Sequence, residues 1–222
     1  MAADAGILFF ILILISGNSL LIAYLASTKK NVLGSIPFSV LMIALSLWSL
    51  LYAVDFDFST NTLMPIFDVL PFFVIVFIPV IWLWFVFDYT GKKEYVKWGY
   101  FIPLMIIPVL TIIIIATNGY HGLFVDAYYQ SAAGKMLISV FYGPWYYIHT
   151  LYCYSLLITG FFLLLWAYGL SPRYQKTQIF YVIFGVSMPC IGNLFFITGL
   201  FPHIDFDLAP LFFLLTGIIE II

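Results

Sequence analysis

The stretch WLWFVFDYTGKKEYVKW, residues 82–98, ends the long apolar run that orients the rest of the chain. The run covers residues 66–90, and about 20 apolar residues of α-helix are enough to cross the hydrocarbon core of a bilayer. It stops at Gly91 and is followed at once by Lys92 and Lys93. Because lysine and arginine gather in cytoplasmic loops, this end of the run is predicted to face the cytoplasm.

The composition excludes a soluble globular domain. Of the 222 residues, 64% are hydrophobic and only 8% are charged, which leaves far more apolar surface than a soluble fold of this size can bury. The formal net charge of −2 gives no reason to expect nucleic acid or another polyanion as a partner. The first apolar run, Gly6 to Ala26, lacks a basic leader and is long enough to span, so we expect a retained helix and not a signal peptide.

Hydropathy separates seven predicted spans, and the chain is therefore predicted to be an all-α membrane protein, a seven-transmembrane helix bundle. The spans cover approximately residues 6–26, 36–55, 66–90, 97–117, 143–168, 174–199 and 206–222. The loops after the first, third and fifth spans hold seven of the eight basic residues, Lys29, Lys30, Lys92, Lys93, Lys97, Arg173 and Lys176. The positive-inside rule then places the N-terminus outside, in a multi-pass protein of the cell membrane surrounded by membrane lipids.

Prolines and one long connection modify this simple bundle. Each proline inside a span, such as Pro79 or Pro108, frees a backbone carbonyl and can kink its helix. The longest connection, between the fourth and fifth spans, contains the β-prone runs LFVDAYY and KMLISVF around a turn-rich SAAG. This pattern predicts an extracellular β-hairpin over the outer mouth of the bundle, where it would control access to a pocket.

The end of the chain, Ile222, falls inside the seventh apolar run with no basic stop signal after it. We therefore expect residues 1–222 to form one membrane domain of a longer protein, whose seventh helix continues into a cytoplasmic output domain.

Motifs of soluble enzymes are absent, so we predict no catalytic residue and no cofactor. The three histidines lie toward the outer side without the spacing of metal ligands, so no metal site is predicted. The seventh span has no lysine for a retinal Schiff base. Cys153 and Cys190 lie in apolar runs and are expected to be free thiols, although their similar depths would permit a disulfide.

Polar or very large side chains on four spans recur at one depth beneath the outer surface. At 1.5 Å per residue, His149 and Asn193 lie roughly 9 Å deep, and Trp145, His149 and Tyr152 share one helix face. Lipid offers polar groups no partner, so they face the bundle interior or a water-filled cavity. We predict an outward-facing ligand pocket formed by Trp48, Asp68, His121, Trp145, His149, Asn193 and Asp207. The alternative, that these groups only hydrogen-bond one another and hold the helices together, remains open.

Seven short stretches, in order along nearly the whole chain, resemble the N-terminal seven-helix sensor region of archaeal and bacterial histidine kinases, the histidine-kinase 7TM domain. They are ALSLWSLLYAVD, WLWFVFDYTGKKEY, PVLTIIIIATNGYHGLF, YGPWY, RYQKTQ, MPCIGN and DFDLAP. The resemblance implies a receptor module that is not itself an enzyme. In such a module an outer pocket binds an unknown small molecule or lipid, and the seventh helix signals to a cytoplasmic kinase that forms a homodimer.

Two other functions remain open from the residues alone. A small transporter would suit seven helices with central prolines, although it predicts an internal repeat that is not visible. A structural or dimerising membrane anchor would need no pocket at all.

Overall fold

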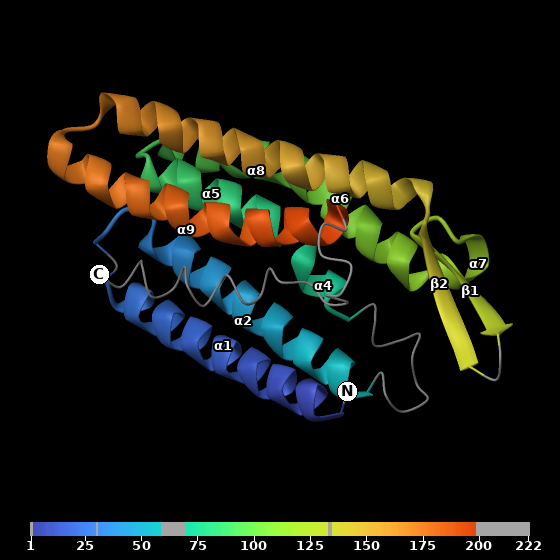
Figure 1. The fold of residues 1–222 in the computed structure, drawn as a ribbon. Coiled ribbons are helices and arrows are strands. Elements are labelled where there is room, and N and C mark those ends of the chain that lie inside the picture. The colour runs from blue at the N-terminus through green and yellow to red at the C-terminus, as the bar shows by residue number, and fades with distance from the viewer. Residues whose placement is uncertain (1, 30, 59–69, 133–134, 199–222) are drawn as a thin grey trace.

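The structure is a computed structural model and describes residues 2–29, 31–58, 70–132 and 135–198 (Figure 1). Its long helices lie side by side in one bundle. They are α1 (Ala2–Thr28), α2 (Ser35–Phe58), α5 (Ile78–Tyr89), α6 (Trp98–Ala116), α8 (Pro144–Leu170) and α9 (Arg173–Thr198). We call the end with the lysine-rich loops the inner end and the opposite end the outer end, following the predicted orientation.

Among the described residues, five helical segments are long and apolar enough to cross a membrane. They are Phe9–Thr28, Ser35–Val54, Phe72–Tyr89, Gly99–Ala116 and Pro144–Leu170, which correspond to the first five predicted spans. Helix α9 covers the sixth predicted span, and the seventh lies outside the described residues. The structure therefore confirms the prediction of a mostly helical chain with several apolar helices of membrane length.

The third span is not one continuous helix. A short helix, α4 (Phe72–Ile75), is separated from α5 by two residues just before Pro79. Proline has no N–H and clashes with the preceding turn. Just before Pro79, the Phe77 N–H donates to the carbonyl of Val74, three residues earlier, at 3.1 Å. An α-helix would instead use the carbonyl four residues earlier. The break therefore has the physical cause that the sequence predicts.

Helix α5 lies between α2 and α8, and these contacts order the bundle. Helix α1 packs on α2, α2 on α5, α5 on α8, and α8 on both α6 and α9. The seam between α1 and α2 is lined by serines, and Ser16 and Ser46 join their hydroxyl oxygens at 2.9 Å. Small hydroxyl side chains let two helices approach closely in lipid and supply each other with hydrogen bonds.

The inner end of α5 is fixed by two glycines. Gly91 has φ +74° and closes the helix, with the Lys92 N–H donating to the Phe87 carbonyl at 2.8 Å and the Gly91 N–H to the Asp88 carbonyl at 3.1 Å. This pair of bonds is the Schellman pattern. Gly34, with φ +82°, donates its N–H to the Asp88 carboxylate at 2.8 Å. The loop between α1 and α2 is thereby tied to the end of α5.

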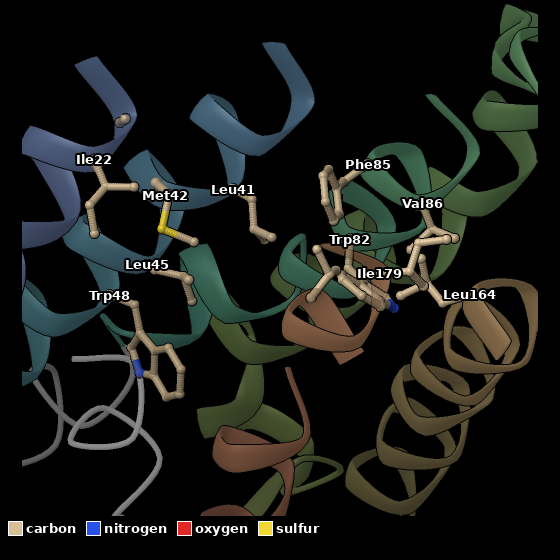
Figure 2. Close-up of a cluster of buried hydrophobic side chains, with 12 residues drawn as sticks. Ile22, Leu41, Met42, Leu45, Trp48, Trp82, Phe85, Val86, Leu164 and Ile179 are labelled. Carbon is tan, nitrogen blue, oxygen red and sulfur yellow. The ribbon is translucent and has the colours of Figure 1, made fainter. Parts of the chain in front are cut away.

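The main apolar core surrounds Trp82 of α5, which is 2% exposed. Figure 2 shows the Trp82 indole among Phe85, Leu164 and Ile179, which come from α5, α8 and α9. A methyl group at Gly160 of α8 would collide with the indole nitrogen of Trp82, so the absence of a side chain there lets the ring lie against the α8 backbone. The bundle centre therefore depends on this one close approach.

We expect Gly160→Ala to destabilise the bundle, because the added methyl group overpacks the site and displaces Trp82, at a cost of about 1–3 kcal/mol. The matched control is Gly169→Ala on the same helix, where a Cβ meets nothing within 4 Å and alanine favours the helix by up to about 1 kcal/mol. Thermal unfolding in mild detergent should show a lower Tm for Gly160→Ala only. Equal behaviour of the two variants would contradict the packing described for Trp82.

Candidate functional site

A hydrogen-bonded cluster joins the outer halves of α6 and α8, centred on Thr111 of α6. The Trp145 indole N–H donates to Thr111 Oγ1 at 3.0 Å, and His149 Nδ1 lies 3.2 Å from the same oxygen. Thr111 is 0% exposed and His149 is 4% exposed. Two polar residues of α8 thus converge on one hydroxyl group in an otherwise apolar stretch of α6.

One arrangement of hydrogens satisfies every member of this cluster. The Thr111 hydroxyl donates to the Ile107 carbonyl at 2.8 Å and accepts from Trp145 and from His149 Nδ1–H. The remaining ring nitrogen, His149 Nε2, lies 3.3 Å from Cys153 Sγ and accepts from the thiol. A hydroxyl can donate once and accept twice, and a neutral imidazole donates from one nitrogen and accepts at the other. The imidazole therefore fits the cluster in its uncharged form.

A second polar contact lies one helical turn deeper. Pro108 of α6 has no N–H, so the carbonyl of Leu104, four residues earlier, lacks its intrahelical donor. The Tyr152 hydroxyl of α8 donates to that Leu104 carbonyl. Since lipid cannot satisfy a freed carbonyl, this tyrosine takes over the role of the missing backbone donor.

The outer ends of α6 and α8 are joined by a short helix, α7 (Asn118–His121), and by the strands β1 (Val125–Ala132) and β2 (Lys135–Tyr142). The strands pair antiparallel, with Val125 opposite Tyr142, and Figure 1 shows them projecting from the bundle. The Asn118 amide group holds the start of β1 by accepting from Phe124 N–H at 2.9 Å and donating to the Val125 carbonyl at 2.6 Å. The strand pair therefore has a firmly bonded base.

Trp145 links this base to the polar cluster. Its backbone N–H donates to the Leu123 carbonyl at 3.0 Å, just before β1, while its indole N–H reaches Thr111. An aromatic series continues the contact, because Tyr146 stacks on Tyr142 at 4.0 Å between ring centroids and meets Phe124 edge-on at 5.7 Å. Partial burial raises the pKa of Tyr142, and the neighbouring Tyr147 raises it further. The Tyr142 phenol is therefore neutral. Trp145 and Tyr146 of α8 are therefore in direct contact with the base of the strands.

Comparison with known protein families identifies the chain. The family described as the N-terminal 7TM region of histidine kinase matches residues 8–222, nearly the whole sequence. The chain belongs to this family. No curated protein and no solved structure matches it.

Membership confirms the resemblance seen in the sequence motifs. The 7TM region is the non-catalytic part of histidine kinases, and its membrane location agrees with the apolar helices of this chain. In the part of the chain that the structure describes, no three His, Cys, Asp or Glu side chains are grouped so that they could hold a metal ion. The described side chains around Thr111 are an indole, an imidazole and a thiol.

The structure brings together two of the predicted pocket residues, Trp145 and His149, through Thr111. Trp48 is buried in the apolar cluster that also holds Trp82. His121 is exposed on α7, with Nε2 at 3.0 Å from Thr117 Oγ1. Asp68 and Asp207, and the side chain of Asn193, lie outside the described residues. The ligand pocket therefore stays a prediction.

Sequence reasoning missed Thr111 and the Leu104 carbonyl, which pair with the predicted α8 face. Thr111 is the one hydroxyl residue in the fourth span between Pro103 and Thr117, and a lone threonine in an apolar helix usually bonds its own backbone. Only the position of α6 against α8 shows that it also serves a neighbouring helix. The shared face of Trp145, His149 and Tyr152 is confirmed, since all three side chains reach α6.

We expect Tyr152→Phe to destabilise the contact between α6 and α8 by about 1–3 kcal/mol, because the Leu104 carbonyl loses its donor in an environment without water. The matched control is Tyr147→Phe on the same helix, where the exposed side chain makes a ring contact and no cross-helix hydrogen bond is described. Unfolding in detergent monitored by tryptophan fluorescence should separate the two variants. A Tyr147→Phe variant as unstable as Tyr152→Phe would argue against the proposed carbonyl cap.

Proposed function

We propose that this chain is the sensory domain of a two-component histidine kinase of the cell membrane. A small molecule or lipid binds beneath the outer mouth, near the base of the strand pair, and the seventh predicted span passes the change to a cytoplasmic output domain in a homodimer. The residues proposed to contact the ligand are Trp48, Asp68, His121, Trp145, His149, Asn193 and Asp207. Family membership supports the kinase assignment.

The observation that supports this proposal most is the double role of Trp145. Its backbone is bonded to the base of the strands and its indole to Thr111. A ligand that engages the indole or the His149 imidazole competes for hydrogen bonds that now hold α6 against α8. Occupation of the site therefore favours a different packing of these helices, which is a shift between two populations of the same bundle.

The energies involved are large enough to signal. A typical hydrogen bond contributes about 0.5–1.5 kcal/mol net, and leaving a buried partner unpaired costs about 1–3 kcal/mol. A coupling free energy of that size changes an equilibrium roughly 5- to 150-fold. Exchange of one or two bonds at Thr111 is thus of the size that typical allosteric coupling requires.

The second candidate function is a structural anchor. The same hydrogen-bonded cluster around Thr111 favours it if the cluster only holds the helices together. Every polar group around Thr111 has a partner within the cluster, which is what a purely cohesive contact between helices requires. The two candidates differ in whether this contact changes during signalling.

We expect His149→Ala in the full-length protein, reconstituted in nanodiscs, to change the basal autophosphorylation rate at least about fivefold, because loss of the imidazole shifts the balance between the two packings. The control is Ser155→Ala on the same helix, whose exposed hydroxyl bonds only the Tyr152 carbonyl of its own turn. This control should retain the native rate.

Native mass spectrometry of the same proteins, purified in gentle detergent, provides the second readout. A co-purified small molecule or lipid that is kept by Ser155→Ala and lost by His149→Ala supports the outer pocket. If His149→Ala leaves both the autophosphorylation rate and the bound species unchanged, the sensory role of this site is contradicted and the anchor is favoured.

A further inference from the structure

His121, the last residue of α7, uses both ring nitrogens in hydrogen bonds. Its Nδ1 lies 3.1 Å from the backbone nitrogen of Leu123, and its Nε2 lies 3.0 Å from Thr117 Oγ1 at the end of α6. Gly122 stands between the two bonded residues with φ +61°, a left-handed conformation that glycine adopts readily, and turns the chain there. The imidazole therefore joins the end of α6 to the segment that leads into β1.

The hydrogen-bond partners define the protonation state of this imidazole. A backbone N–H can only donate, so Nδ1 accepts from Leu123 and carries no hydrogen. The Thr117 hydroxyl donates to the Ile113 carbonyl at 2.7 Å, and its oxygen accepts from Nε2–H. A neutral imidazole donates from one nitrogen and accepts at the other. The two bonds together therefore require His121 in its neutral form, with the hydrogen on Nε2.

Leu123 connects this imidazole to α8. Its N–H donates to His121, and its carbonyl accepts the Trp145 backbone N–H at 3.0 Å. The Trp145 indole in turn donates to Thr111. Only Leu123 and Trp145 therefore stand between His121 and the Thr111 cluster along this path of hydrogen bonds.

Protons from the outer solution have access to His121, which is exposed. Histidine is the residue that ordinarily changes its charge between pH 5 and 8. The charged side chain beside this turn is the exposed Asp126 of β1, whose Cγ would lie 3.9 Å from a Cβ placed on Gly122. Neither α6 nor α8 contains Asp, Glu, Lys or Arg. The other titratable groups nearby are Tyr120 of α7 and the tyrosines of α8, which titrate far above this range, and the buried His149 of the Thr111 cluster.

We propose that His121 is a proton-controlled latch at the base of the strand pair. The latch is the hydrogen bond from the Leu123 N–H to the unprotonated Nδ1. A proton taken up from the outer solution occupies the Nδ1 lone pair, so two donors then face each other and the bond is lost. The Asp126 carboxylate favours the resulting positive charge. The latch is therefore closed at high pH and opens as the pH falls through the range in which His121 takes up its proton.

This latch goes beyond the proposed function, because it needs neither a bound ligand nor a signalling role. It adds a second, pH-dependent contact to a base that Asn118 already holds without titrating, through its bonds to Phe124 and Val125. Acid is therefore expected to release Leu123 and to leave the Asn118 bonds in place.

Nitrogen NMR of ring-labelled histidine tests the protonation states directly. The full chain in nanodiscs contains three histidines, and the signals of His121 are those lost in a His121→Asn variant. At about pH 8 we expect the hydrogen on Nε2 alone, and at about pH 5 a hydrogen on each nitrogen. A neutral His121 with its hydrogen on Nδ1, or a His121 that stays neutral at about pH 5, overturns the proposal.

Hydrogen exchange resolved to single amides tests the latch itself, with each rate divided by the intrinsic rate at the same pH. One hydrogen bond corresponds to a factor of about two to ten. The protection of the Leu123 amide should fall by that factor between about pH 8 and about pH 5. The Phe124 amide, which donates to Asn118 Oδ1, should retain its protection. Unchanged protection of Leu123, or an equal loss at both amides, contradicts the latch.

Two variants at one position complete the test. In His121→Asn the carboxamide oxygen accepts the N–H two residues later and does not titrate, so Leu123 should stay protected at both pH values. In His121→Ala the acceptor is missing, so Leu123 should be unprotected at both. If His121→Asn shows the same pH-dependent loss as native protein, another group such as Asp126 or His149 is its source, and the proposal is overturned.

Discussion

A polar group inside a bilayer has no water to bond, so it must find its partner within the protein, on its own helix or on a neighbouring one. This constraint determines how α6 lies against α8. Pro108 removes a donor from α6, and the Tyr152 hydroxyl of α8 supplies a replacement to the Leu104 carbonyl. One turn nearer the outer end, Thr111 accepts the Trp145 indole N–H and lies within bonding distance of His149. The two helices therefore share a ladder of polar contacts that neither could satisfy alone.

The inner half of the bundle is held by different means. Around Trp82 the helices pack through apolar side chains and through the close approach at Gly160, while Gly34, Asp88 and Gly91 fix the loops. Close-packed cores transmit displacement because they deform little, whereas hydrogen bonds can be exchanged for bonds to a ligand. The proposed sensory function uses this difference between a polar outer contact and an apolar inner core.

Much of this arrangement was predictable from the sequence, because hydropathy and charge act over whole segments. The five apolar spans and the break before Pro79 follow from composition and from the chemistry of proline. The candidate site was harder to predict, since counting 1.5 Å per residue gives the depth of a side chain but not its direction around the bundle. Trp48 and His149 have similar predicted depths, yet Trp48 belongs to the apolar cluster that contains Trp82, whereas His149 bonds toward Thr111. Thr111 carried no signal of its own, because its role appears only when two distant helices meet.

Through Trp145, the Thr111 cluster connects the base of the strand pair to the helices. Hydrogen–deuterium exchange of the whole chain in nanodiscs, comparing native protein with Thr111→Val, tests this connection most directly. If the cluster connects these parts, loss of the hydroxyl frees Trp145, and the backbone amides of residues 118–126 and 143–149 exchange faster, while those of the inner loop at 88–97 are unchanged. Faster exchange confined to α6 around residue 111, with the base of the strands unaffected, would contradict the connection.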